Sequence, residues 1–290
     1  INGFQVYDLN KTANTTGEIG ITVSTYDNLG TDKFHGNVSL TSNHFGLLRG
    51  TANVSGPLNK KGLLFSAGAY VSYDPGSFGV DFEDYWADRT QMYKLALTQK
   101  YNGGKDRISV FYKYVDTKAL AGSSSLFRYM GDGKTNEIDG IKIGETSFFE
   151  STGNIWFKDP LTGELSQKSL SKNFGAESHV VDLIGHNEFK NNWKLDYTLR
   201  YSQTSSALYF FGLLGARSTE GANWSYLDGK TYTGDQVFLH VSSGTPYQKI
   251  KTISGIANLN KKTANHDFNF GIMEQHYDPG TYIASRSFYY

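Results

Sequence analysis

The sequence predicts an all-β fold, an antiparallel β-barrel that spans a membrane. Three observations lead to this fold class. Apolar and polar residues alternate along many segments, the connections between those segments alternate between short and long, and the composition is rich in aromatics. The 290 residues include 20 Tyr, 19 Phe, 4 Trp and 32 Gly, and only 19% are charged, below the roughly 25% of an average soluble protein.

The alternation has a period of two residues, which is the period of a β-strand. It is clearest from Trp193 to Ser202, where apolar Trp, Leu and Tyr alternate with Lys, Asp, Thr, Arg and Ser. Such a segment has one face in an apolar medium and the other in a polar one. We count nine segments of this kind, and the other eight are Phe34–Thr41, Arg49–Ser55, Leu63–Tyr73, Tyr93–Thr98, Ile108–Tyr114, His179–Phe189, Lys249–Leu259 and Asp267–Tyr277.

The connections between these segments differ sharply in length. Short ones fall at 56–62, 102–106, 190–192 and 260–266, and long ones at 74–89, 119–178 and 203–247. Loops beyond about 12 to 15 residues are uncommon in compact domains. Short turns at one end and long loops at the other are typical of outer-membrane barrels, whose short turns are periplasmic and whose long loops are extracellular.

A soluble β-sandwich or propeller also has half-buried strands and is the main alternative. Two features favour the membrane barrel. Several segments reach about ten residues, whereas soluble strands more often have five or six. Large aromatics stand near segment ends, where they suit the girdles at the two membrane interfaces. These aromatics are Tyr70, Tyr73, Tyr93, Tyr101, Trp193 and Tyr201.

Composition and charge exclude several classes of protein. The 28 basic and 28 acidic residues give no net charge, which argues against a nucleic-acid partner. With no Cys, the chain has no disulfide, thiolate zinc site or cysteine nucleophile. The longest apolar run, 207–216, is about half of what a membrane-spanning helix needs.

The segment from Gly17 to Leu120 resembles the TonB-dependent outer-membrane receptors. GEIGITVSTYDNLGTDKFHGNVSLTSNHFG is similar to the end of the plug domain and the first barrel strand of that family. LLRGTANVSGPLNKKGLLFSAGAYVSYDPGSF resembles its second strand, tight GPL turn and third strand, and YKLALTQKYNGGKDRISVFYKYVDTKAL its next two strands. Beyond Leu120 the resemblance is architectural, although HNEFKNNWKLDYTLRYSQT still resembles a family hairpin.

This resemblance implies a fragment of a larger barrel of about 22 strands with a plugged lumen. Residues 1–32 would be the C-terminal end of the plug domain and its connector, and 33–290 the N-terminal part of the barrel, with extracellular loops at 119–178 and 203–247. The missing plug would contact the energy-transducing TonB protein. The implied location is the outer membrane of a Gram-negative bacterium, with outer-membrane lipid around the barrel.

The function implied by the resemblance is active uptake of a scarce, bulky nutrient. A ferric siderophore or other iron chelate is the first expectation for the cargo, with cobalamin or an oligosaccharide as rivals, the last with a possible surface lipoprotein partner. A passive porin or adhesion barrel remains the alternative class, and a hydrolase built on a membrane barrel is a third.

No motif in the sequence points to catalysis, a metal or a cofactor, and we expect none of the three. Gly131–Gly140 has several carboxylates, but Lys134 stands where an EF-hand loop needs a ligand, so an exposed turn is the better interpretation. The seven His are scattered without a zinc motif, and His179 and His186 would lie on opposite faces of one strand.

Aromatic residues in the two longest loops are the candidate ligand-binding residues. Aromatic rings beside polar groups suit sugars, siderophores and other planar ligands, and loops often carry function. The alternative is that the rings pack the loops onto one another, and the sequence leaves both open. The six candidates are Phe127, Tyr129, Trp156, Phe157, Tyr209 and Trp224.

Overall fold

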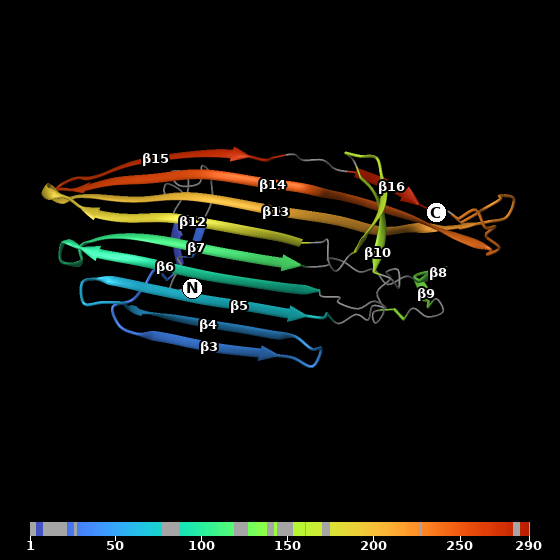
Figure 1. Cartoon of the computed structure of the whole chain (residues 1–290), viewed down its shortest axis with the longest axis horizontal. Helices are drawn as coiled ribbons and strands as arrows, with labels where there is room; N and C mark the ends of the chain where they lie inside the picture. Colours follow the sequence, from blue (N-terminus) through green and yellow to red (C-terminus); the bar gives the residue numbers. More distant parts are fainter. Residues whose placement is uncertain are drawn as a thin grey trace.

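The computed structural model describes residues 4–7, 22–25, 28–76, 87–118, 127–137, 142–143, 153–159, 161–169, 175–226, 228–280 and 285–289. Its main feature is one antiparallel sheet in which nine strands pair in the order β15-β14-β13-β12-β7-β6-β5-β4-β3 (Figure 1). Each strand pairs with the strand that follows it in the chain, except that β7 pairs with β12 and the short strands β8 to β11 lie in the connection between them. This is a meander, the connectivity of a barrel wall.

The nine strands agree with the nine alternating segments of the sequence. Their bounds are β3 His35–Ser42, β4 Leu48–Pro57, β5 Leu63–Asp74, β6 Asp88–Tyr101, β7 Asp106–Lys118, β12 Gly175–Glu188, β13 Trp193–Ser218, β14 Gln236–Lys262 and β15 Asp267–Asp278. A short strand, β16 Ser285–Tyr289, pairs with β14 beyond the end of β15. Three separate hairpins are β1 Phe4–Tyr7 with β2 Thr22–Thr25, β8 Arg128–Gly131 with β9 Lys134–Asn136, and β10 Asn154–Lys158 with β11 Leu165–Ser169.

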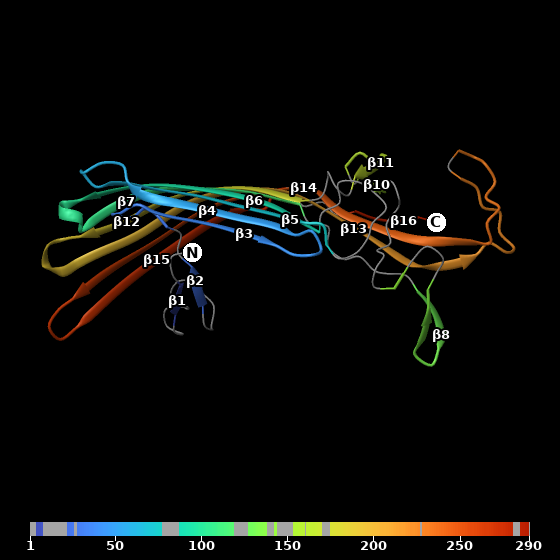
Figure 2. The same cartoon turned by 90° about the horizontal axis from the view of Figure 1, so that it is seen from below.

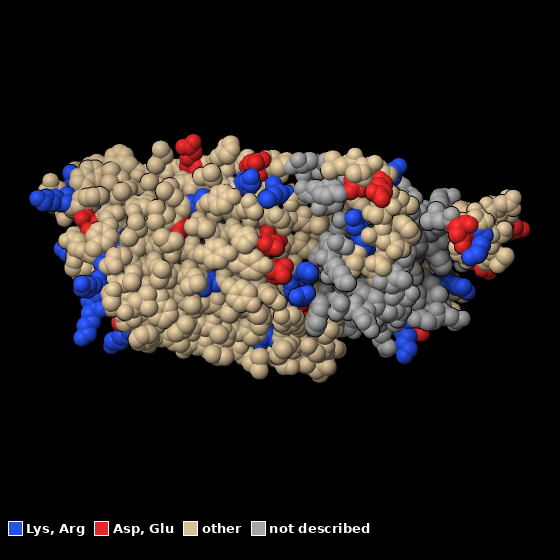
Figure 3. All heavy atoms as spheres, in the orientation of Figure 1, with Lys and Arg blue, Asp and Glu red and all other residues tan. Residues whose placement is uncertain are grey.

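The sheet is curved, and β1 and β2 lie on its concave side (Figure 2). Side chains alternate between the two faces. Leu95, Leu97 and Val110 are exposed on the convex face, whereas Ala96 and Phe111 are buried on the concave face. The convex face shows few charged residues across its middle (Figure 3). An outward apolar band and an inward polar wall are the arrangement of a transmembrane barrel.

The short turns owe their shape to residues that accept positive φ. A 3-10 turn at Asn102–Gly104 has φ of 51° at Asn102 and 67° at Gly103. A second at Lys190–Asn192 has φ of 64° at Asn191. Asn and Gly tolerate this region because Gly has no Cβ and the Asn side chain can bond locally. Asn and Gly at these positions therefore allow the chain to reverse direction within a few residues between β6 and β7 and between β12 and β13.

One predicted loop is much shorter than expected. The sequence predicted a loop over 203–247, but β13 continues to Ser218 and β14 starts at Gln236, so the connection covers 219–235. The two strands remain paired from Leu208↔Thr245 to Ser218↔Gln236. The register shifts between Ser206 and Leu208 and between Leu213 and Gly215. Such bulges break the period-two pattern, which is why the alternation did not reveal these halves of the strands.

The other long loop keeps its position but contains local structure. The predicted loop 119–178 ends before Gly175, where β12 begins, and it contains the β8–β9 and β10–β11 hairpins. Ile155 and Phe157 of β10 are each only 1% exposed, and β10 lies against β14 and β16. Apolar side chains thus give this part of the long-loop end a small core of its own.

One of the predicted girdle residues lies on the other face. Tyr93, Tyr101 and Tyr201 are each more than 40% exposed and share the face of the outward Leu side chains. Tyr70 instead shares the inward parity of buried Ser66 and Ser72 on β5, because residues an even number apart lie on one face of a strand. Among the described residues, no helix is long and apolar enough to cross a membrane.

Candidate functional site

The concave wall of the sheet carries a ladder of polar side chains from neighbouring strands. Thr98 of β6 and Ser109 of β7 bond through their hydroxyls at 2.7 Å, and both are buried. Ser178 and Thr204 make the equivalent contact between β12 and β13 at 2.9 Å. Cross-strand hydroxyl pairs satisfy each other and stabilise the sheet. The wall therefore offers polar groups to whatever occupies the concave side.

Two contacts of acidic side chains lie farther along the same wall. Arg200 of β13 donates from Nε and Nη2 to the two carboxylate oxygens of Asp182 on β12, each at 2.7 Å. Asp182 is 2% exposed, and the two parallel hydrogen bonds from Arg200 satisfy both of its carboxylate oxygens. His186 Nδ1 lies 2.6 Å from the Asp196 carboxylate. Asp182 is therefore a buried acid with a bonded partner, whereas the Arg200 and Asp196 side chains are about half exposed.

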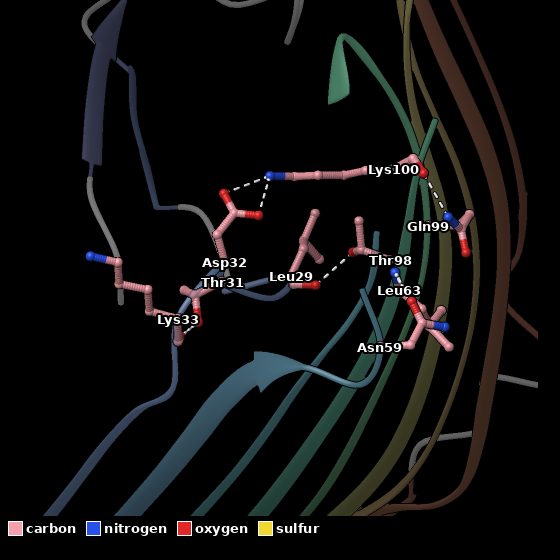
Figure 4. A network of polar contacts seen from close by, with 9 residues as sticks. All are labelled: Leu29, Thr31, Asp32, Lys33, Asn59, Leu63, Thr98, Gln99 and Lys100. Atoms are coloured by element: carbon pink, nitrogen blue, oxygen red, sulfur yellow. Dashed lines mark hydrogen bonds and ion pairs between the residues drawn. The ribbon is translucent and has the colours of Figure 1, made fainter. Parts of the chain in front are cut away.

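The segment before the first barrel strand is attached to this wall (Figure 4). The Thr98 hydroxyl donates to the Leu29 carbonyl at 2.6 Å, and Lys100 Nζ lies 2.7 Å from both carboxylate oxygens of Asp32. Figure 4 shows Lys100 reaching across from β6 toward Asp32. We call residues 28–32 with their wall partners the connector clasp.

The clasp has a second attachment point on β4. Asn28 Nδ2 donates to Ser55 Oγ at 3.0 Å, and the hydroxyls of Thr31 and Ser55 lie 2.9 Å apart. Ser55 is 1% exposed. The clasp thus bonds to β4 and β6, two strands separated by β5, and fixes the connector against the concave wall.

Two hollows flank the connector on the concave face. One has a volume of about 410 Å³ and is lined by Asn28 and by residues of β3 to β7, among them Asn37, Asn53 and Lys94. The other, of about 390 Å³, includes Leu29 and the Asp182–Arg200 pair. Both volumes fall in the range of ligand pockets, and both hollows open toward the concave side of the sheet.

The structure separates the candidate loop aromatics into exposed and buried ones. Phe127 and Tyr129 are 51% and 64% exposed, and the Tyr129 hydroxyl accepts the Gly133 N–H at 3.2 Å. Phe157 is 1% exposed and belongs to the small core under β10, while Trp156 on the opposite face of that strand is half-buried. An exposed ring can meet a ligand directly, whereas Phe157 supports the loop from within.

The remaining two candidates lie farther along the chain. Tyr209 belongs to β13 and not to a loop, and its side chain lies outside the described residues. Trp224 is half-buried in the 219–235 connection, where its carbonyl accepts the Tyr232 N–H at 2.8 Å. Lys230 in this connection lowers the pKa of the Asp228 carboxyl through a hydrogen bond. The described contacts do not bring the six aromatics together at one point.

Interpretations of the acidic loop and of the histidines can also be compared with the structure. Gly131, Asp132 and Gly133 all have positive φ and form the β8–β9 turn. Asp139 lies outside the described residues. Within the described part of the chain, no three His, Asp or Glu residues are grouped for a metal ion.

The two histidines of β12 lie on opposite faces, as their odd separation predicted. His179 contacts outward Tyr112 through Nδ1 at 2.8 Å and Glu177 through Nε2 at 3.0 Å. His186 contacts Asp196 on the inner wall. His179 therefore belongs to the aromatic border of the convex face, where Tyr93 stacks on Tyr114 and Tyr114 contacts the His179 ring.

Sequence reasoning did not identify the connector clasp or the Asp182–Arg200 pair. The clasp joins residues 69 positions apart in the chain, and its partners are ordinary Ser, Thr and Lys. The alternation in the sequence does predict that Asp182 and Arg200 both face the inner wall. Their contact, however, depends on the register that pairs Asp182 with Arg200 across β12 and β13. A hairpin alignment built outward from the Lys190–Asn192 turn would have found it.

The fold of this chain is similar to that of solved outer-membrane receptor structures. The ferripyoverdine receptor of the outer membrane of Pseudomonas aeruginosa, bound to ferripyoverdine, matches with a TM-score of 0.52 and 16% identity, over 91% of this chain and 30% of that one. FpvA of P. aeruginosa bound to a heterologous pyoverdine matches with a TM-score of 0.53 and 17% identity over the same shares. The FpvAI–pyocin S2 complex gives 0.52 and 17%, covering 31% of that chain.

The likeness confirms the predicted fold, a partial antiparallel transmembrane barrel, and confirms the resemblance to TonB-dependent outer-membrane receptors at the level of the fold. The chain spans less than a third of the length of these receptors. No family model and no curated protein matches it. The ferripyoverdine receptor among these structures is named as an outer-membrane protein.

Proposed function

We propose that this chain is the connector and first barrel strands of a TonB-dependent receptor that imports a ferric siderophore across the outer membrane of a Gram-negative bacterium. The observation that carries the proposal is the fold likeness to ferripyoverdine receptors over 91% of the chain. At 16 to 17% identity, this likeness concerns the fold, so the cargo is the inferred part.

We extend the proposal to the domain layout, which the fold likeness and the clasp support. Residues 1–32 are the end of a plug and its connector, and 33–290 are barrel. In support, residues 28–32 bond to the concave wall at Ser55, Thr98 and Lys100, and β3 starts directly after them at His35. A plug preceding the connector is the part that TonB would contact, and lipid would surround the convex face.

Cargo would be recognised at the long-loop end. Phe127 and Tyr129 present exposed rings on and beside the β8–β9 hairpin, and half-buried Trp156 and Trp224 add further aromatic surface. Rings of this kind give contact area to a planar chelate. Phe157 would act indirectly, because it is buried and holds β10 in place.

Growth under iron limitation tests the proposal. A strain lacking the gene is supplied with single ferric siderophores as the sole iron source, and uptake of radiolabelled iron is measured. We expect loss of uptake for at least one siderophore and restoration by the wild-type gene. The strain could instead take up every iron chelate normally and lose uptake of cobalamin or an oligosaccharide in parallel assays. That result would disprove the siderophore as cargo but would still support a TonB-dependent receptor.

The loop aromatics provide the matched variants. Phe127→Ala with Tyr129→Ala removes two exposed rings, and we expect weaker siderophore binding, by about tenfold for the loss of two ring contacts, with a normal amount of receptor in the membrane. The control is Leu161→Ala with Leu165→Ala, which removes exposed apolar side chains from the β10–β11 hairpin. Equal binding by both variants would remove Phe127 and Tyr129 from the site.

A further inference from the structure

Exposed lysines gather at the end of the sheet where β4 turns into β5, β6 into β7, β12 into β13 and β14 into β15. Three turns between strands, 58–62, 102–105 and 189–192, contain lysine, and the fourth, 263–266, follows Lys261 and Lys262 at the end of β14. The adjoining strand ends carry three acidic residues, Asp106, Glu188 and Asp267. Five of these lysines are exposed and Lys261 is partly exposed. We call this set the lysine collar, and its members are Lys60, Lys61, Lys105, Lys190, Lys261 and Lys262.

The acidic residues beside the collar neutralise its charge only in part. Asp267 stands opposite Lys262 in the β14–β15 ladder. Within the described residues none of the six lysines forms an ion pair. Asp106 is 7% exposed and accepts hydrogen bonds from Asn102 and from the Glu188 N–H. Glu188 itself bonds to Lys194 at 2.6 Å, which is not in the collar. The collar is therefore a positive rim on a chain whose net charge is zero.

The collar directly adjoins the apolar convex face. Lys261 Nζ lies 4.8 Å from the centre of the Trp193 ring, and Tyr101, Phe189 and Phe268 are exposed at the same end of the sheet. Aromatic residues of this kind mark the membrane–water interface. Lysines one step beyond them reach the level of the lipid headgroups, with their methylene stems on the apolar side.

The spacing of the collar distinguishes a lipid from a compact protein partner. One turn occurs for every two strands, so lysines recur about every 10 Å along the rim. A rim of this kind follows the perimeter of the barrel, as the surrounding layer of lipid does. A protein interface would instead gather its contacts into one patch with a buried centre.

We propose that the lysine collar binds the phosphate groups of anionic phospholipids in the leaflet at the short-turn end. Basic residues at an anionic membrane surface each strengthen binding by about fivefold. The collar would thereby fix the depth and tilt of the barrel wall. This inference depends on the membrane barrel and not on which cargo the receptor takes.

Lipid titration of the complete receptor tests the collar. The purified receptor in a neutral detergent is titrated with phosphatidylglycerol and with phosphatidylcholine of the same chain length, and bound lipids are counted by native mass spectrometry. We expect the wild-type receptor to prefer phosphatidylglycerol by about tenfold or more, since each lysine contributes about fivefold. The collar variant should bring this preference below about twofold. It combines Lys60→Gln, Lys61→Gln, Lys190→Gln and Lys262→Gln.

A matched variant at the opposite end controls for total charge. Lys134→Gln, Lys142→Gln, Lys168→Gln and Lys230→Gln remove the same charge from the long loops, and the preference should stay at the wild-type value. Equal binding of the two lipids by wild type overturns the proposal. The proposal is also overturned if the collar variant keeps the wild-type preference for phosphatidylglycerol while its heat-modifiable mobility shows that it is folded. If such a variant loses TonB-dependent uptake, the collar serves a protein partner instead.

Discussion

At the scale of single residues, the Asp182–Arg200 pair sets the strongest local constraint on the inner wall. Asp182 is 2% exposed, whereas the Arg200 side chain is 49% exposed. Removing Arg200 leaves a buried carboxylate without its fork. The desolvation penalty of the pair falls mostly on Asp182, because the Arg200 side chain is still half exposed to water.

We therefore expect Arg200→Met to lower the free energy of unfolding of the complete barrel by about 3 kcal/mol, the lower end of the cost of breaking a buried pair. The measurement is the urea midpoint in detergent micelles, followed by tryptophan fluorescence. The double variant Asp182→Leu with Arg200→Met should recover much of the loss, since no charge is then left buried. A single variant as stable as wild type would show that water reaches Asp182.

At the scale of elements, period-two alternation was enough to predict the nine strands of the sheet. It worked because each strand has one face toward apolar surroundings and one toward a polar wall. It failed for the outer halves of β13 and β14, where the run from Ala207 to Ala216 has no alternation and two bulges shift the register. Sequence also could not place the aromatics of the loops, because burial of Phe157 depends on β10 packing against β14 and β16.

The connector is the element whose position is easiest to test, because the chain has no Cys. Asn28→Cys with Ser55→Cys replaces a contact of 3.0 Å between side-chain atoms. We expect this pair to form a disulfide in outer-membrane preparations after mild oxidation, seen as a shift in electrophoretic mobility that reductant reverses. Asn28→Cys with Ser39→Cys is the control, since Ser39 lies on β3 outside the clasp. Equal cross-linking of both pairs would mean that the connector is not held at Ser55.

At the scale of the whole molecule, the neutral composition hides an ordered arrangement of charge. The convex face is poor in charge across its middle (Figure 3). The inner wall contains the Asp182–Arg200 ion pair, and the short-turn end carries six lysines beside three acidic residues. Zero net charge is thus the sum of differently charged surfaces, each matched to lipid, lumen or headgroups.

The two ends of the sheet lead to the last prediction. Among the described residues, β3 pairs only with β4, and β15 only with β14, so both outer edges keep unpaired N–H and C=O groups. In hydrocarbon each unpaired group costs several kcal/mol, and only a closed barrel removes such edges. We expect the 290-residue chain, refolded alone into planar bilayers, to give no stable single-channel conductance.

The control is the complete receptor without its plug, which should conduct because its barrel is closed and its lumen open. Refolding of the chain is followed by heat-modifiable mobility in the same preparation, so that failure to insert and failure to close can be told apart. Discrete, reproducible conductance steps from the chain alone would contradict the prediction. They would mean that β3 and β15 pair with each other, or with further copies of the chain, to close a pore.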